Sequence, residues 1–303
     1  MAYTASAVAP HRLPEKNGGI DMNGNSGKFQ SPSAGDLAIE RIDAEAGKSL
    51  HAASHSEYMS RGCTVSHAQL DDGASYHTIL SDKIWLRGDG DRKRCQAVLY
   101  DVLLKYLSRA GFCLHSGRVL FCGLGNAKIT SDALGPMICD RLFVSGGDSV
   151  YRSIGFTELY AIKPGVPAQS GIGTGEQIRI TADHLGADLI ITADAVVART
   201  TKRLASVIQV SDCGVKAGSG AGMHSDEISS RTMPCRVISI GIPTVIRASV
   251  LVSDSLREHG ITPPVYEGEE FLVSNSEIDV ICECYADIVS GAVNKLFTAP
   301  LSE

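Results

Sequence analysis

The strongest constraint on the fold of this chain is a short apolar run that ends near an acidic residue. Leu189, Ile190 and Ile191 follow one another within ADLIITADAVVART, and Asp194 comes three residues later. The run is too short for an amphipathic helix and is rich in β-branched side chains, which is typical of a buried strand in an α/β sheet. Ligands and reactive groups of such sheets gather outside the carboxyl ends of strands. Asp194 is therefore either a cap for the next segment or part of a site.

A glycine-rich loop follows the next strand-like run. Residues 206–210 form that run, and Asp212 comes shortly after it. Four glycines then fall within nine residues: Gly214, Gly218, Gly220 and Gly222. Glycine lets the backbone take positive φ and approach a ligand or another chain closely. The sequence therefore predicts a close-approach loop at 214–222.

Strand-like and helix-like segments alternate over most of the chain. Runs of β-branched and apolar residues predict strands, and apolar positions at helical spacing predict helices. The expected strands are 63–70, a run through 84–86, 118–122, 159–162, 188–193, 206–210 and 236–240, and the expected helices are 36–47, 92–110, 132–144, 177–185 and 276–296. The alternation predicts an α/β fold with three layers, in which a mostly parallel sheet is flanked by helices.

The first 35 residues differ in composition from the rest of the chain. Gly, Ser, Asn and Pro are frequent there, and no periodic apolar face occurs. Such a segment cannot bury enough apolar surface to become ordered. We therefore expect a flexible N-terminal extension at 1–35 and a single α/β domain at 36–303, which is long enough to bury a full-sized core.

Charge, hydropathy and cysteine content narrow the function classes. The net charge of −6 gives no broad basic surface for binding nucleic acid. No apolar run reaches the length of a membrane-spanning helix, and the first residues lack the pattern of a signal peptide. The nine cysteines form no C-x-x-C pair, which favours buried thiols in a reducing compartment. We expect a soluble cytoplasmic protein without a membrane or direct nucleic-acid partner.

A second acidic residue is placed much like Asp194. The strand 118–122 is followed by the loop GLGN and then by Asp132, at the start of a predicted helix that tolerates Pro136 only in its first turn. Glycines before a helix suggest a phosphate cradle, but neither a G-x-G-x-x-G nor a P-loop signature is present. Ser131 or Asp132 is alternatively a helix N-cap. If the two strands are neighbours, the two carboxylates converge and can share a proton.

Groups that could bind a metal or act as nucleophiles are scattered. His51 and His55 have i, i+4 spacing but lack the glutamate of H-E-x-x-H, and Cys282 and Cys284 point to different sides of a helix. Residues 224–227 mix His, Ser, Asp and Glu, and no G-x-S-x-G elbow occurs. We assign these groups structural or surface roles, and we expect neither a metal nor a cofactor.

Five ordered segments resemble the germination protease (spore protease) family: VLFCGLGNAKITSDALGP, GVPAQSGIGTGEQI, ADLIITADAVVART, IQVSDCGVKAGSGAG and VISIGIPTV. The resemblance extends over residues 35–303 and is densest from 118 to 245. It implies a fold shared with hydrogenase-maturation endopeptidases. It also implies an aspartic-type endopeptidase of the spore core that cleaves small acid-soluble spore proteins during germination. The resemblance further implies that the protein is made as an inactive zymogen and assembles as a homotetramer. Proteolytic removal of the N-terminal segment is then expected near residues 35–40.

The resemblance also assigns the site. The two catalytic aspartates of the family correspond to Asp132, in SDALGP, and Asp194, in TADAVVAR. A helix start favours an ionised Asp132 and an apolar strand favours a neutral Asp194, which suggests base and acid in that order, although the roles could reverse. The expected substrate-binding or site-loop positions are Gly123, Gly125, Asn126, Arg199, Asp212, Gly218 and Gly220. Two alternatives remain open: a metal-dependent maturation-type endopeptidase, and a catalytically silent relative that acts as a binding protein.

Overall fold

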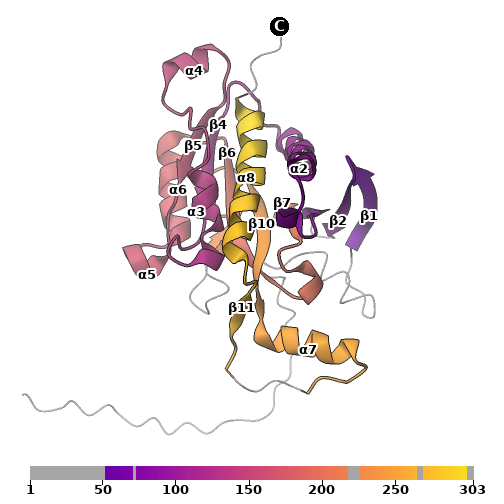
Figure 1. Ribbon diagram of the computed structural model, residues 1–303. Coiled ribbons are helices and arrows are strands. Elements are labelled where there is room, and N and C mark those ends of the chain that lie inside the picture. The colour runs from indigo at the N-terminus through magenta and orange to yellow at the C-terminus, as the bar shows by residue number, and fades with distance from the viewer. Residues whose placement is uncertain (1–51, 71–72, 218–225, 265–268, 299–303) are drawn as a thin grey trace, which may run out of the picture. The chain divides into compact units, whose positions relative to one another are not determined.

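The computed structural model describes residues 52–70, 73–217, 226–264 and 269–298 (Figure 1). The expected extension 1–35 and helix 36–47 lie outside these ranges, and so do Gly218 and Gly220. Within the described ranges, no helix is long and apolar enough to cross a membrane.

One sheet of nine strands organises the described residues. The strands lie in the order β1-β2-β3-β7-β10-β6-β4-β5, and β11 pairs with β10 beside this path. Their bounds are β1 Ala52–Ser60, β2 Cys63–Leu70, β3 Ser75–Leu80, β4 Arg118–Gly123, β5 Glu158–Ile162, β6 Leu189–Ala198, β7 Val207–Ser211, β10 Arg236–Arg247 and β11 Leu272–Ser274. A separate two-stranded sheet joins β8 (Val215–Ala217) to β9 (Asp226–Ile228).

The sheet is mixed, so the prediction of a mostly parallel sheet was wrong. The pairs β10–β6, β6–β4 and β4–β5 are parallel. The pairs β1–β2, β2–β3, β3–β7, β7–β10 and β10–β11 are antiparallel. The pairs β1–β2 and β2–β3 are antiparallel because these strands follow one another through short turns, which only antiparallel strands allow. The parallel part is the one that carries both candidate aspartates.

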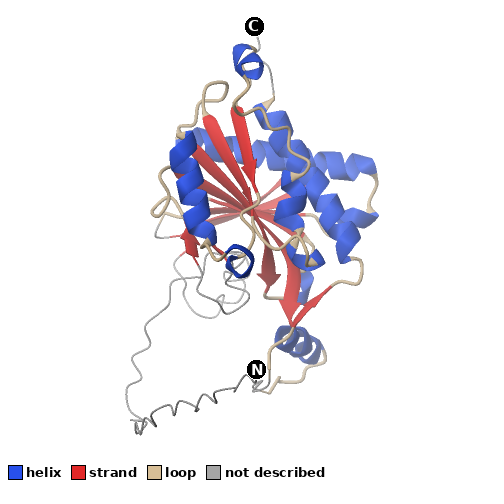
Figure 2. Ribbon diagram, turned by 90° about the vertical axis from the view of Figure 1, so that its left-hand side faces the viewer, coloured by secondary structure: helices blue, strands red, loops and turns tan. Residues whose placement is uncertain are grey.

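Helices pack on both faces of the sheet (Figure 2). They are α2 Asp89–Ala110, α3 Leu134–Cys139, α4 Ser149–Ser153, α5 Pro167–Ser170, α6 Thr174–Leu185, α7 Ala248–Glu258 and α8 Ile278–Phe297, with 3₁₀ turns η1 Ile84–Leu86, η2 Thr130–Asp132 and η3 Thr201–Arg203. Along β4, Val119 and Phe121 join the core under α2, α3 and α8, whereas Leu120 and Cys122 join the core under α6. This alternation follows from the two-residue period of a strand.

The two long helices agree with the sequence prediction. The apolar positions predicted for α2 are all buried: Val98, Leu99, Val102, Leu103, Tyr106 and Leu107. In α8 the predicted positions after Ile278 are buried as well: Ile281, Tyr285, Ile288, Val289, Ala292 and Leu296. A long amphipathic helix buries one stripe of apolar side chains, and the helical spacing of these residues can be recognised in the sequence alone.

Several element boundaries differ from the prediction. The run through Ile84–Leu86 is a 3₁₀ turn rather than a strand, because Lys83 takes a left-handed conformation with φ of 46° and ends the extended path. The helix expected at 132–144 is shorter, and α3 occupies Leu134–Cys139 with Pro136 in its first turn as required. Both β6 and β10 run past their predicted ends to Ala198 and Arg247, because each supplies the other's hydrogen-bond partners.

Candidate active site

Asp194 lies where the ladder between β4 and β6 ends. The last pair of that parallel ladder is Gly123 with Ala193, and the backbone N–H of Leu124 donates to the carbonyl oxygen of Ala193 at 2.9 Å. The two strands are neighbours, as the convergence of the two carboxylates requires, and they run parallel. Asp194 is not the end of its own strand, however. It pairs with Gly241 of β10, and β6 continues beyond it.

The GLGN loop after β4 holds the carboxylate of Asp132. The backbone N–H of Asn126 donates to Asp132 Oδ2 at 2.7 Å. Gly125 has a φ of +106°, and a Cβ built there would lie 2.1 Å from the carbonyl oxygen of Asp132 and 2.9 Å from its Oδ1. Only glycine fits this position, since any side chain would displace Asp132.

Two further glycines, Gly123 and Gly135, allow the start of α3 to pack closely against the ends of β4 and the adjoining part of β6. A Cβ on Gly135 would lie 2.3 Å from the carbonyl oxygen of Leu124 and 2.6 Å from that of Ala193. A Cβ on Gly123 would lie 2.2 Å from the carbonyl oxygen of Gly135. Gly135 comes three residues after Asp132, and Ala193 directly precedes Asp194. The two aspartates therefore approach one crossing point of β4, β6 and α3.

The helix-cap interpretation of Asp132 is not supported. The N-cap of α3 is Ala133, and no side chain caps this helix. Neighbouring elements instead hold the turn η2 that contains Asp132. Thr244 of β10 donates its hydroxyl to the carbonyl oxygen of Ser131 at 2.7 Å, and the thiol of Cys282 on α8 donates to the carbonyl oxygen of Thr130 at 3.5 Å. A carboxylate that caps no helix, on a turn fixed from two sides, is available for chemistry.

The two carboxyl groups interact electrostatically. Burial, with a further contribution from the charge of Asp132, raises the pKa of Asp194 to about 7, and a hydrogen bond from the backbone N–H of Ala195 acts in the opposite direction. Burial also raises the pKa of Asp132, and the hydrogen bond from Asn126 opposes that shift. Displaced pKa values in neighbouring acids are a feature of catalytic carboxylate pairs.

Asn126 connects the loop to a neighbouring helix. Its Oδ1 accepts the backbone N–H of Lys128 at 3.0 Å and the Nε2 group of Gln169, on α5, at 2.8 Å. Of the predicted site-loop residues, Gly125 and Asn126 thus lie beside Asp132, whereas Gly123 lies against Gly135 and Cys139 of α3. The sequence analysis missed Gln169 and Thr244, because their hydrogen-bond partners are distant in sequence. It also missed Gly135, although a glycine next to a proline at a helix start is a readable signal.

The structure does not bring Arg199 and Asp212 to the aspartates. Arg199 follows the end of β6, five residues after Asp194, which at about 3.3 Å per residue is roughly 16 Å along the strand. Asp212 accepts the backbone N–H of Ser75 at 2.8 Å, beside β3 and β7, and β10 separates β7 from β6. Gly218 and Gly220 remain outside the described residues.

Other reactive groups do not gather into a metal site. Among the described residues, no three His, Cys, Asp or Glu side chains are arranged to hold a metal ion. His55 Nε2 lies 2.9 Å from the hydroxyl oxygen of Ser66, whereas Cys282 and Cys284 are both buried in α8. His51 lies outside the described ranges.

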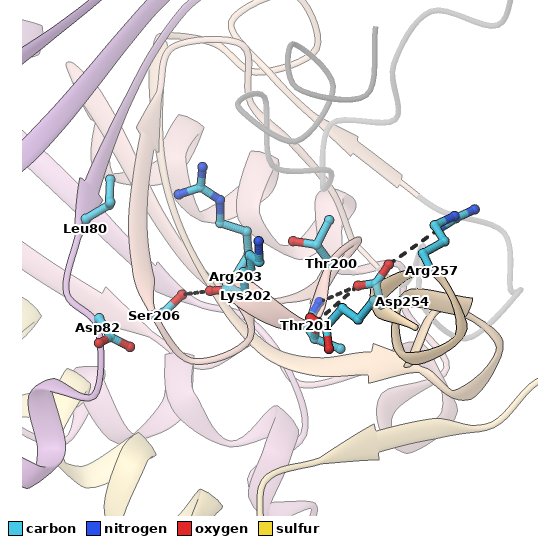
Figure 3. Close-up of a pocket in the computed structure, with 10 residues that line it drawn as sticks. Leu80, Asp82, Thr200, Thr201, Lys202, Arg203, Ser206, Asp254 and Arg257 are labelled. Atoms are coloured by element: carbon cyan, nitrogen blue, oxygen red, sulfur yellow. Dashed lines mark hydrogen bonds and ion pairs between the residues drawn. The ribbon is translucent and has the colours of Figure 1, made fainter. Parts of the chain in front are cut away.

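A cavity of about 480 Å³ lies beyond the end of β6 (Figure 3). It is bounded by the end of β3, by η3 with the residues around it, and by α7: Leu80, Asp82, Thr200, Thr201, Lys202, Arg203, Ser206, Asp254, Arg257 and Glu258. Asp254 fixes one wall by accepting the backbone N–H of Thr201 at 2.9 Å and its hydroxyl at 3.2 Å. Neither candidate aspartate lines this cavity, so its size carries no argument about catalysis.

The fold and the site thus define a class of protein: an α/β protein with two electrostatically coupled aspartates beside its parallel strands. Comparison with known proteins gives the family. A family model described as germination protease matches residues 64–258. The chain belongs to the germination protease family.

Curated germination proteases from three bacteria illustrate the similarity. The protein of Clostridium acetobutylicum is 36% identical over 186 residues, which cover 60% of this chain and 57% of that protein. The protein of Oceanobacillus iheyensis is 31% identical over 242 residues, covering 73% and 66%. That of Bacillus cereus is 30% identical over 241 residues, covering 73% and 65%. The matched part thus spans less than two thirds of these relatives' length.

Proposed function

We propose that this chain is an aspartic-type endopeptidase that degrades small acid-soluble spore proteins during germination, with Asp132 and Asp194 as its catalytic pair. The observation that supports the proposal is the raised pKa of Asp194, which lies beside the junction of β4 and β6: burial is the largest cause, and the charge of Asp132 adds to it. The family supplies the substrate class, and we further propose that the mixed α/β fold is related to that of hydrogenase-maturation endopeptidases.

Peptide hydrolysis requires a base that takes a proton from water and an acid that protonates the leaving nitrogen. The N–H of Asn126 favours an ionised Asp132, which suits the base. The pKa of about 7 keeps a proton on much of Asp194 at neutral pH, which suits the acid. After cleavage Asp132 holds the proton taken from water and Asp194 has given its own to the leaving nitrogen. One proton then passes from Asp132 to Asp194 and restores the starting state, as the joint titration of the pair allows.

The activation, the assembly and the location that we propose are carried over from the family. We propose that the chain is made as a zymogen, that an N-terminal segment ending near residues 35–40 is removed, and that the active form is a homotetramer in the spore core. The described residues begin at Ala52, so none of the processing region contributes to this part of the proposal.

The direct test uses the full chain and a form that begins at Asp36, each incubated with a small acid-soluble spore protein. Fragments are mapped by mass. We expect the shortened form to cut the substrate at few sites and to keep its rate when a strong chelator is present. Loss of cleavage with chelator, restored by a metal ion, would support the metal-dependent alternative. A folded protein that cuts in neither form would support the silent relative.

A further inference from the structure

Gly241 on β10 lies directly beside Asp194 in the sheet. The parallel ladder between β10 and β6 pairs these two residues. Residues opposite each other in a ladder point to the same face, and neighbouring strands lie about 4.8 Å apart. This face is turned away from α2 and α8, because the preceding residues, Ala193 and Ile240, belong to the core under those helices. The place of the missing side chain is therefore next to the carboxyl group of Asp194.

The sheet is less covered at this pair than around it. Gly241 is partly exposed, whereas all the remaining residues from 237 to 244 of β10 are buried. On β6, residues 189–193 are buried, and Asp194 is the first that is partly exposed. On its other side Gly241 pairs with Gln209 of β7. The space above Gly241 thus lies between a carboxyl group and a carboxamide, which both hydrogen-bond the polar atoms of a peptide.

The backbone does not require glycine at position 241. Its φ lies outside the positive region, and glycine inside a strand weakens packing. A Cβ there would lie 3.2 and 3.6 Å from the two methyl groups of Val196 and would meet no other described atom within 4 Å. At Gly123 and Gly135, in contrast, it would meet backbone oxygens at 2.2 and 2.3 Å. Glycine in a strand without such a reason marks a place where a ligand or another backbone comes close.

We propose that Gly241 is a substrate-positioning residue, whose missing side chain leaves the space in which the scissile peptide group lies against the carboxyl group of Asp194. This role rests on the function proposed above, since the space matters for hydrolysis only if Asp194 acts on a peptide. An acid must come within about 2.6–3.2 Å of the nitrogen that it protonates. A side chain at 241, one strand spacing of about 4.8 Å from Asp194, would stand where that peptide group has to lie.

Steady-state cleavage of a small acid-soluble spore protein tests this role. Gly241→Val should lower kcat/KM by about 10²-fold, the usual cost of misplacing a reacting group by an ångström, and Gly241→Ala by a smaller factor. Urea midpoints near that of the parent would separate the effect from unfolding, and Gly241→Ala decides if Gly241→Val does not fold. An unchanged kcat/KM in the folded variants would overturn the proposal, while cleavage by the parent would still support the proposed function.

Gly90→Ala is the matched control for the added methyl group. Gly90 also has a φ outside the positive region, and a Cβ there meets only the guanidinium group of Arg94, at 3.7 Å. This variant should keep the kcat/KM of the parent. A loss equal to that of Gly241→Ala would contradict a role specific to position 241.

Val196 provides the test of a purely structural role. If Gly241 only makes room for the methyl groups of Val196, then Val196→Ala should restore the activity of Gly241→Ala. We expect instead that the double variant falls as far below Val196→Ala as Gly241→Ala falls below the parent. Restored activity in the double variant would overturn the proposal.

Binding without cleavage separates this role from the catalytic claim. In Asp132→Asn protein, which should cleave too slowly to interfere, fluorescence anisotropy gives the Kd for a labelled spore protein. Adding Gly241→Val should raise this Kd by at least about 10-fold, because the side chain fills the place of the peptide. Adding Gly90→Ala should leave it unchanged. An equal Kd with and without Gly241→Val would overturn the proposal even if no form of the protein cleaved.

Discussion

Gly125 shows how one residue positions the candidate pair. Its φ is +106°, and a Cβ at this position would lie only 2.1 Å from the carbonyl oxygen of Asp132, which leaves no room for a side chain. Gly125→Ala should therefore displace Asp132 and lower the cleavage rate by about 10²-fold, the usual cost of misplacing a reacting group by an ångström. Initial rates on a small acid-soluble spore protein measure this effect.

Gly147→Ala is the matched control for this change. Gly147 also has a positive φ, +79°, but a Cβ there meets nothing within 4 Å. It should lose some stability through backbone strain and keep its cleavage rate. Equal losses of activity in the two variants would show that strain, rather than the contact with Asp132, causes the effect.

The ionisation of Asp194 predicts how stability depends on pH. In the unfolded chain this carboxyl titrates near its ordinary pKa of 3.8, and in the folded chain near 7. Between these values the folded state holds more protons, so the free energy of unfolding falls as the pH rises through this window. Asp194→Asn removes this dependence and should be more stable than the parent at pH 8 by on the order of 4 kcal/mol.

Urea unfolding of both proteins at pH 5 and pH 8 checks this prediction. The difference between them should be larger at pH 8 than at pH 5. Asp183→Asn, at an exposed position on α6, controls for the new amide. A variant that is less stable than its parent at pH 8 would mean that the carboxylate of Asp194 is well solvated or paired in the folded protein.

Residue-scale features of the site were predictable only in part. The positions of Asp132 and Asp194 after short apolar runs were readable, because reactive groups of α/β sheets gather at such points. The hydrogen bond from Asn126 to Asp132 and the contact of Thr244 with Ser131 were not. The first depends on the conformation of the loop between β4 and η2, and the second on how η2 meets β10, more than a hundred residues away in the sequence.

Among the elements, α2 is attached to the sheet through Tyr106. The buried Tyr106 hydroxyl bonds the carbonyl oxygens of Ser75 in β3 and Val210 in β7, at 2.9 and 3.0 Å. Tyr106→Phe leaves these acceptors short of a donor and should cost about 1–2 kcal/mol of stability. Tyr100→Phe on the same helix, where the ring lies 5.0 Å from the Lys295 ammonium, should cost less than about 0.5 kcal/mol.

Denaturant unfolding of the two variants at pH 7 makes this comparison. Equal midpoints for Tyr106→Phe and the parent protein would show that water replaces the lost hydroxyl, which contradicts its assigned role between α2 and the strands.

Element types were easier to predict than strand partners. The apolar stripes of α2 and α8 depend on local periodicity, and the strands β4 and β6 depend on short apolar runs. The antiparallel edge β1-β2-β3-β7 was missed because neither β1 nor β3 was predicted as a strand, and because the pairing of β3 with the distant β7 leaves no local signal. The same reason explains the unpredicted extension of β6 to Ala198, which exists only because β10 lies alongside.

For the whole molecule, the composition of residues 1–35 leads to a prediction about activation. This segment has no apolar face and precedes the DLAIE stretch at 36–40, so it should be removed when the enzyme becomes active. Intact-mass analysis of activated protein should find a new N-terminus near residues 35–40. A fully active protein that still begins at Met1 would contradict this prediction.

The central claim is that Asp132 and Asp194 act as one catalytic unit, and single-turnover cleavage by Asp→Asn variants tests it most directly. Each single variant keeps the side-chain shape and should lower the cleavage rate by about 10²–10⁴-fold, because it removes one partner in proton transfer. The double variant should be no slower than the slower single variant, since groups that act together are not additive. Asp183→Asn should keep the parent rate. A folded Asp132→Asn or Asp194→Asn protein that cleaves at nearly the parent rate would contradict the account.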